Sequence, residues 1–208
     1  MNATYAAKYC FCKIRAWSRG VPRTSTPDGK LNLHLGCGIV NSPGFVNIDA
    51  MPMRHVHCVQ PVDRLQNFRS GSADLIYASH VLEHISHRDT LNVLREWRRV
   101  LKPGGVLRLA VPDFDVISRL YTDGGFDVAV IEGVLLGGQD YAYNYHKAVF
   151  TEQSLTRLLE QAGLTRVRRW TYGESPMTSL SDHSGLIITH RNQSYPISLN
   201  IEAVNGGN

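Results

Sequence analysis

Apolar residues are distributed along this chain in two patterns, and each pattern predicts a different secondary-structure element. Helical spacing of apolar residues predicts helices at residues 116–121 and 151–162, and an amphipathic helix at residues 87–101. Thr151 is a candidate N-cap for the helix at residues 151–162. Short continuous apolar runs predict strands at residues 31–35, 45–48, 74–78, 106–111, 165–171 and 197–204. Strands that alternate with helices in this order predict an α/β fold with a mainly parallel sheet.

The stretch from residue 31 to residue 49, LNLHLGCGIVNSPGFVNID, carries the strongest functional signal. A predicted strand enters a Gly36-Cys37-Gly38 turn, and the next predicted strand ends on Asp49. Glycines let a backbone approach a ligand closely, and a carboxylate at the carboxyl end of a strand can accept hydrogen bonds from ribose hydroxyls. The pattern therefore predicts a nucleoside-containing cofactor.

The details favour S-adenosylmethionine over a dinucleotide. A dinucleotide fingerprint has a third small residue after the loop, an acid roughly 20 residues further on and a helix N-terminus for the pyrophosphate. Here the third position is Asn41, and Asp49 follows too soon for a long crossover helix. S-adenosylmethionine has no phosphate, so close backbone contact and a ribose acceptor are sufficient.

These motifs resemble those of the class I S-adenosylmethionine-dependent methyltransferases. The match is to a bacterial subgroup with the signatures LGCG…PGF.NID, SADLIYASHVLEH and LKPGG, and it covers roughly residues 30–170, then more loosely the SLNIEA ending. The resemblance implies a Rossmann-like, mainly parallel seven-stranded sheet with helices on both faces and an antiparallel last strand. It also implies a domain over residues 31–208, preceded by an N-terminal arm at residues 1–30.

The resemblance places the cofactor against residues at the strand ends. Asp49 would bind the ribose, Asp63 would face the adenine, and the residues after the 74–78 strand would lie near the methionine part. One departure is His34, where many relatives carry an acid that helps to hold the cofactor's amino group. The cofactor-binding residues implied are Gly36, Cys37, Gly38, Asp49, Asp63, Ser79 and His80.

Methyl transfer is an in-line displacement, so alignment is the main task, and a general base adds about 10²–10⁴-fold for an alcohol acceptor. The candidates for that base are His146, Asp113 and His80. His146 could instead be a tether that only hydrogen-bonds its own segment. Of the acids at the 106–111 strand's end, Asp115 is expected to cap a helix and Asp113 to face the substrate.

Residues 116–150 are less regular, and glycines, tyrosines, Asn144 and His146 gather at residues 137–150. A segment at that edge of an open sheet overhangs the ligand crevice, so it is expected to cover the substrate.

No metal is expected. His80, His84 and His87 share the i, i+4, i+7 spacing of one helix face, and His55 and His57 could be partners in a metal site. Packing and pocket lining account for the same spacing, and activity is expected to survive chelation.

Composition fits an ordinary globular domain, with 43% hydrophobic and 19% charged residues and a net charge of +4. The basic spots at residues 98–99 and 166–169 are expected to be solvated, and nucleic acid is not indicated. The sequence shows no signal-like segment and no membrane span. The cysteines form no C-x-x-C pair and are expected to be free thiols in a reducing cytoplasm: Cys10, Cys12, Cys37 and Cys58.

The sequence therefore predicts a cytoplasmic methyltransferase that acts on a hydroxyl of a small molecule or glycan. The preference for a glycan-type acceptor rests on the resemblance. The alternatives are a methyltransferase of RNA or protein, which would predict a basic groove or an N-P-P-Y-like motif, and a catalytically inactive cofactor-binding subunit, which His34 favours. The oligomeric state is left open.

Overall fold

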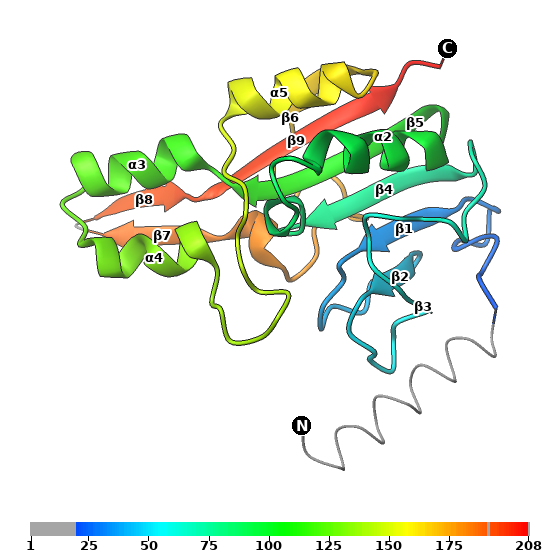
Figure 1. Ribbon diagram of the computed structural model, residues 1–208, viewed down its shortest axis with the longest axis horizontal. Coiled ribbons are helices and arrows are strands. Elements are labelled where there is room, and N and C mark those ends of the chain that lie inside the picture. The colour runs from blue at the N-terminus through cyan, green and yellow to red at the C-terminus, as the bar shows by residue number, and fades with distance from the viewer. Residues whose placement is uncertain (1–19, 191, 208) are drawn as a thin grey trace.

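The computed structural model describes residues 20–190 and 192–207 and shows one mainly parallel sheet (Figure 1). The strand order is β3-β2-β1-β4-β5-β9-β6, and β9 runs antiparallel to both of its neighbours. This confirms the predicted seven-stranded sheet with an antiparallel last strand. The strands are β1 (Asn32–Leu35), β2 (Val46–Asp49), β3 (Cys58–Val59), β4 (Ala73–Ser79), β5 (Leu101–Pro112), β6 (Leu164–Arg169) and β9 (Ser198–Asn205).

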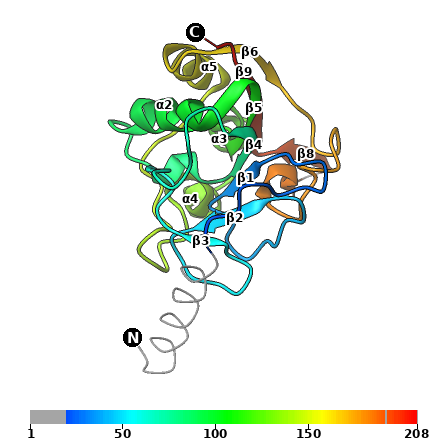
Figure 2. The same cartoon turned by 90° about the vertical axis from the view of Figure 1, so that its right-hand side faces the viewer.

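Helices α2 (Thr90–Val100) and α5 (Glu152–Gln161) pack on the same side of this sheet (Figure 2). Alternation along β1 sends Leu33 and Leu35 to that side, where they share a core with Trp97 of α2 and Leu155 of α5. His34 points to the opposite side and packs against Phe45 and Tyr77. On that side the irregular segment at residues 175–186 contributes Met177 and Leu180 to the cover.

A second, smaller core lies beyond the carboxyl end of β5. Helices α3 (Phe114–Thr122) and α4 (Val128–Leu136) pack there with a hairpin of β7 (Ile187–His190) and β8 (Gln193–Pro196) (Figure 1). None of α4, this hairpin and β3, which is only two residues long, was predicted. The remaining short elements are the 3-10 turns η1 (Leu82–His84) and η2 (His183–Gly185).

Two local predictions are wrong. His80 has a φ of 54°, and the helical residues that follow are only the single turn η1, so His80, His84 and His87 share no helix face. The cap of α3 is Asp113, whose carboxylate accepts hydrogen bonds from the backbone N–H groups of Asp115 and Val116. Capping falls to Asp113 because it is the last extended residue before the helix, with a ψ of 101°.

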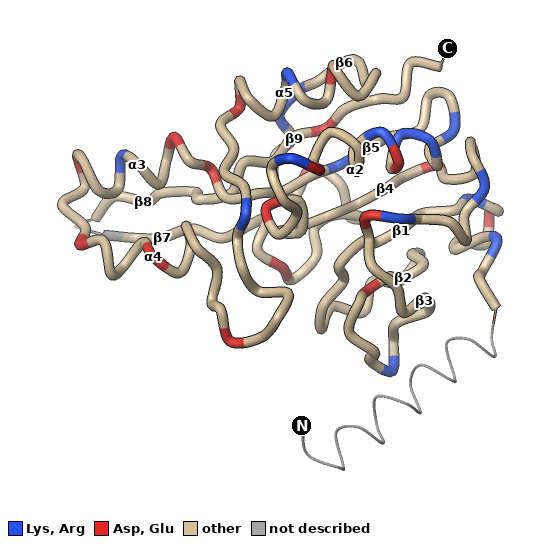
Figure 3. The backbone as a smooth tube through the Cα atoms, in the orientation of Figure 1, with Lys and Arg blue, Asp and Glu red and all other residues tan. Residues whose placement is uncertain are grey.

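The basic spots are partnered by acids. Arg99 lies 2.7 Å from Glu96, and Arg168 lies 2.6 Å from Glu174. Figure 3 shows acidic positions interspersed with the basic ones along these elements. None of the helices described reaches the length and hydrophobicity that a membrane crossing requires. Most of the predicted N-terminal arm, with Cys10 and Cys12, lies outside the described residues.

Candidate functional site

The loop between β1 and β2 turns at two glycines with left-handed backbone. Gly36 and Gly38 have φ values of 60° and 51°, which residues with a Cβ rarely adopt. A Cβ on Gly36 would lie 2.5 Å from Cγ2 of Val81, whereas a Cβ on Gly38 would meet nothing within 4 Å. Cys37 between them is buried, and burial raises the pKa of its thiol, so the thiol stays protonated. The loop therefore presents bare backbone to the space beside it.

Asp49 connects the end of β2 to this loop. Its Oδ2 accepts a hydrogen bond of 2.8 Å from the backbone N–H of Gly38, and its Oδ1 accepts one of 2.7 Å from the N–H of Met51. Each carboxylate oxygen can accept more than one hydrogen bond, so capacity remains for ribose hydroxyls. The same carboxylate can thus hold the loop and face a ligand.

A cavity of about 280 Å³ opens beside the loop. Tyr141 covers part of it, and its pKa is raised first by burial and then by the negative charge of Asp49. Four further predicted cofactor residues line it together with Asp49, so the structure brings this part of the set together. The predicted residues in its wall are Gly36, Gly38, Asp49, Asp63 and His80.

A larger cavity of about 650 Å³ adjoins the first and shares the glycine loop, His80, His84 and Tyr141 with it. It contains the other two predicted cofactor residues, Cys37 and Ser79, and the predicted base His146. The segment predicted to cover the substrate lines it with Gly137, Gly138, Tyr141, Asn144 and His146. Asp49 lines only the smaller cavity, and His146 and His183 line only the larger one.

His80 is fixed at the junction of the two cavities. Its backbone N–H donates to the carbonyl of Ala110 over 2.8 Å. Its Nδ1 lies 3.2 Å from Oε1 of Glu83, and its Nε2 lies 3.1 Å from the hydroxyl of Ser198. Since both ring nitrogens already have a protein partner, this ring is suited to lining the pocket.

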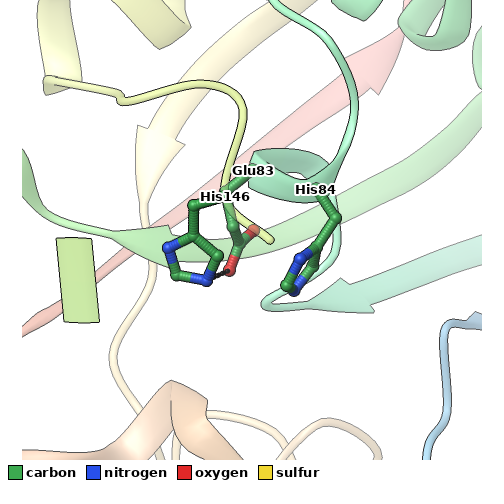
Figure 4. Close-up of side chains that lie close together, drawn as sticks. All are labelled: Glu83, His84 and His146. Atoms are coloured by element: carbon green, nitrogen blue, oxygen red, sulfur yellow. Dashed lines mark ion pairs between the residues drawn. The ribbon is translucent and has the colours of Figure 1, made fainter. Parts of the chain in front are cut away.

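Glu83, His84 and His146 converge beside the larger cavity (Figure 4). His84 and His146 line that cavity, whereas Glu83 does not. Glu83 is 1% exposed, and its Oε1 lies 4.0 Å from Nε2 of His146. Burial would raise the pKa of Glu83, but the neighbouring His80 and His84 rings outweigh it and lower that pKa. Burial lowers the pKa of His146 below its ordinary value, although the Glu83 carboxylate acts in the opposite direction.

Two sequence-predicted residues lie away from this group. Asp113 is buried as the cap of α3, 3.6 Å from Arg169, and lines a separate cavity of about 1370 Å³ between α3 and the β7–β8 hairpin. His34 lies on the far side of β1, where its Nδ1 is 2.7 Å from the hydroxyl of Ser42. Burial lowers the pKa of His34 to about 4.

Sequence reasoning did not give Glu83 a role. The SHVLEH motif places Glu83 between two histidines, and this was the available signal. The motif does not show that His146 lies beside this carboxylate, which only the structure reveals. Asp182 and His183 were missed as well, because the turn-rich stretch that carries them has no apolar pattern to place it. Both line the larger cavity, and the His183 ring lies 5.3 Å from that of His80.

Comparison with known proteins gives one family and a set of distant relatives. The family model described as "Methyltransferase domain" matches residues 14–168. The ubiquinone/menaquinone biosynthesis C-methyltransferase UbiE of Hahella chejuensis is 29% identical over 104 residues, which is 47% of this chain and 41% of that protein. UbiE of Vibrio vulnificus is 29% identical over 116 residues, 52% of this chain and 44% of that protein. The chain thus matches less than half the length of these curated relatives.

Solved structures share the fold at low identity. One chain of the Haloferax volcanii complex between the Trm112 methyltransferase activator and a methyltransferase aligns with a TM-score of 0.53 and 15% identity, covering 97% of this chain and 95% of that one. A SAM-dependent methyltransferase from Archaeoglobus fulgidus aligns with a TM-score of 0.52 and 12% identity, covering 97% and 96%. At these identities the likeness is one of fold alone.

Proposed function

The chain belongs to the methyltransferase-domain family, and on that premise we propose that it methylates a hydroxyl oxygen of a small molecule or glycan, with S-adenosylmethionine as donor. The observation that carries the proposal is the pair of adjoining cavities described above. The smaller cavity lies against a bare glycine loop and contains Asp49, and the larger one is lined by His146, which faces the buried Glu83. One site thus offers both a nucleoside pocket and groups for an acceptor.

The residues present fit this cofactor. Gly38 faces open space, and Asp49 retains capacity for ribose hydroxyls. When bound, S-adenosylmethionine supplies an electrophilic methyl group. We propose that it is held by Gly36, Cys37, Gly38, Asp49, Asp63, Ser79 and His80.

Among the predicted bases, the geometry supports His146. Asp113 caps α3 outside the two cavities, and both ring nitrogens of His80 have protein partners. The lowered pKa of His146 leaves its imidazole neutral near pH 7, so it can accept a proton from a hydroxyl. In this proposal His146 activates the acceptor, and segment 137–150 forms the wall that orients it.

The test is methyl transfer from labelled S-adenosylmethionine to fractionated hydroxyl-bearing metabolites. His146→Ala should lower turnover about 10²-fold or more and change cofactor affinity little. His87→Ala is the matched control, because His87 is exposed in the same region and lines neither cavity. Unchanged turnover in His146→Ala would contradict the role of His146, and transfer to no hydroxyl would contradict the acceptor class.

A carbon acceptor is the second candidate, because the curated relatives are named C-methyltransferases. With a ¹³C-labelled methyl donor, the chemical shift of the product distinguishes a methyl ether from a carbon-bound methyl group. A carbon-bound label would contradict the hydroxyl acceptor and assign a carbon nucleophile to the reaction instead.

A further inference from the structure

We propose that Glu83, His84 and His146 form a binding site for a divalent transition metal, with Zn²⁺ as the best-matched ion. Their ligand atoms all lie within 4.8 Å of one another (Figure 4). Two histidines and one glutamate are one of the donor sets found in catalytic zinc sites, which keep a further position open for water or substrate.

The backbone brings these residues together from distant parts of the chain. Glu83 and His84 end the turn η1 after β4, whereas His146 comes from the segment that follows α4. The carbonyl of Glu83 accepts hydrogen bonds from the N–H groups of Lys147, at 2.7 Å, and Ala148, at 3.2 Å. The segment is therefore anchored on the glutamate itself, and the cluster does not depend on one flexible side chain.

The environment of Glu83 is one in which a bound cation would stabilise the carboxylate. The side chain is 1% exposed, and within the described residues its carboxylate has the ion-pair contact with His80 but no hydrogen bond of good geometry to either oxygen. Burying a carboxylate lowers the stability of the fold unless hydrogen bonds or an opposite charge compensate for the lost hydration. The imidazole of His80, 3.2 Å from Oε1, is the nearest partner, and it also contacts Ser198. A divalent ion would neutralise the carboxylate and give its oxygens a ligand.

The orientation of His84 matches that of a metal ligand. Its Nδ1 lies 3.2 Å from the backbone carbonyl of Tyr145, and a carbonyl can only accept, so Nδ1 carries the proton. Nε2 then carries the lone pair. Metal-binding histidines commonly donate their other ring nitrogen to a carbonyl in this way. Tetrahedral zinc at about 2.0–2.1 Å from each ligand spaces its ligands about 3.4 Å apart, so side-chain rotation has to shorten the separations of up to 4.8 Å in the cluster.

The position of the site suggests its use, and this step rests on the proposed function. His84 and His146 line the cavity that also contains Ser79 and His80. A metal there would bind an acceptor through its oxygen and lower the pKa of that hydroxyl. His146 would then be a ligand rather than a free base, and acceptors able to bind a metal through oxygen would be preferred. The expectation of no metal concerned a different set, His80, His84 and His87, whereas the cluster described here joins His84 to Glu83 and His146.

The first experiment measures metal in the full-length protein without any acceptor. After chelation and gel filtration, titration with Zn²⁺ in competition with a chromophoric chelator should give one equivalent bound per chain. Glu83→Gln and His146→Ala should each weaken binding at least about tenfold, whereas His87→Ala should bind as the wild type does. Co²⁺ in place of Zn²⁺ should give a visible absorption spectrum typical of nitrogen and oxygen ligands in the wild type and in His87→Ala.

Circular dichroism and S-adenosylhomocysteine binding establish that each variant is folded. If Glu83→Gln is unfolded, the proposal is tested by the Zn²⁺ affinity of His146→Ala and by the cobalt spectrum of the wild type. No binding by the chelated wild type, or equal binding by folded His146→Ala and His87→Ala, would overturn the proposal. Hydroxyl methylation that survives removal of the metal would overturn the metal's role and leave the proposed function intact. A bound metal without hydroxyl methylation would support the site and contradict the proposed acceptor.

Discussion

The carboxylate of Asp49 has a structural and a proposed binding role at the same position. It already accepts hydrogen bonds from the N–H groups of Gly38 and Met51, and it lines the cavity proposed for the nucleoside. Charge-assisted hydrogen bonds to ribose hydroxyls are worth roughly 1.5–3 kcal/mol each. Asp49→Ala should therefore weaken S-adenosylhomocysteine binding at least about tenfold in calorimetry, with the fold intact.

Asp89→Ala is the control for this measurement, because Asp89 is exposed and its side chain makes no capping hydrogen bond. Equal affinities for the folded Asp49→Ala and Asp89→Ala proteins would show that Asp49 only holds the loop.

His34 predicts a pH dependence of stability. Burial lowers its pKa to about 4 in the folded protein, whereas the ordinary value is 6.5. Between these values the unfolded chain binds a proton that the folded chain does not, so stability falls as the pH drops from 6.5 towards 4. The effect is on the order of 3 kcal/mol at full extent. Urea unfolding between pH 4 and 7 should show a steeper loss for the wild type than for His34→Leu. Parallel curves would show that His34 does not titrate as a buried group.

At the level of single residues, the sequence predicted best where a motif fixes the backbone. The glycine loop and Asp49 lie together because parallel strands bring their carboxyl ends to one edge. Asp113 was misjudged because a carboxylate after a strand serves equally as a helix cap, and only the backbone dihedrals decide. Glu83 was overlooked because its neighbour His146 lies 63 positions away along the chain.

Among the elements, the connection from α4 to α5 depends on the glycine pair Gly137 and Gly138. Gly137 has a φ of 79°, and a Cβ there would lie 2.6 Å from the carbonyl oxygen of Asn144 and 3.0 Å from Cδ2 of His146. The loop closes by hydrogen bonds from the N–H of Gln139 to Asn144 and from that of His146 to Leu136. This tight turn places His146 in the cavity wall.

Gly137→Ala should therefore displace His146 and destabilise the fold by about 1–2 kcal/mol or more, because left-handed backbone disfavours alanine. Gly133→Ala is the matched variant: Gly133 is inside α4, and a Cβ there would meet nothing within 4 Å. The free energy of unfolding of Gly133→Ala should be about 0.5–1 kcal/mol higher than that of the wild type. Urea unfolding measures both variants. A Gly137→Ala protein as stable as the wild type would show that the loop can relax without cost.

The sequence predicted the elements whose apolar residues recur with a clear period or whose ends carry a capping residue, and it missed the others. The apolar stripe of α2 and the Thr151 cap of α5 are local signals, and both helices formed where expected. Helix α4 is apolar on nearly all sides and contains Gly133, so no stripe marked it as a helix. The β7–β8 hairpin is mostly exposed, so burial never imposed an apolar alternation on its sequence.

Across the whole molecule, the sheet order places the glycine loop, the end of β4 and the segment after α4 at a common edge, and this arrangement decides which nucleotide fits. From Gly38 the chain makes turns and enters β2 at Val46, so residues 39–45 supply no helix N-terminus for a pyrophosphate. S-adenosylhomocysteine should therefore stabilise the protein, by about 2.7 kcal/mol at 100 times its dissociation constant, and raise the melting temperature. NAD at the same concentration should raise it far less. A larger shift with NAD, or no shift with either ligand, would contradict the assignment of the two adjoining cavities to S-adenosylmethionine.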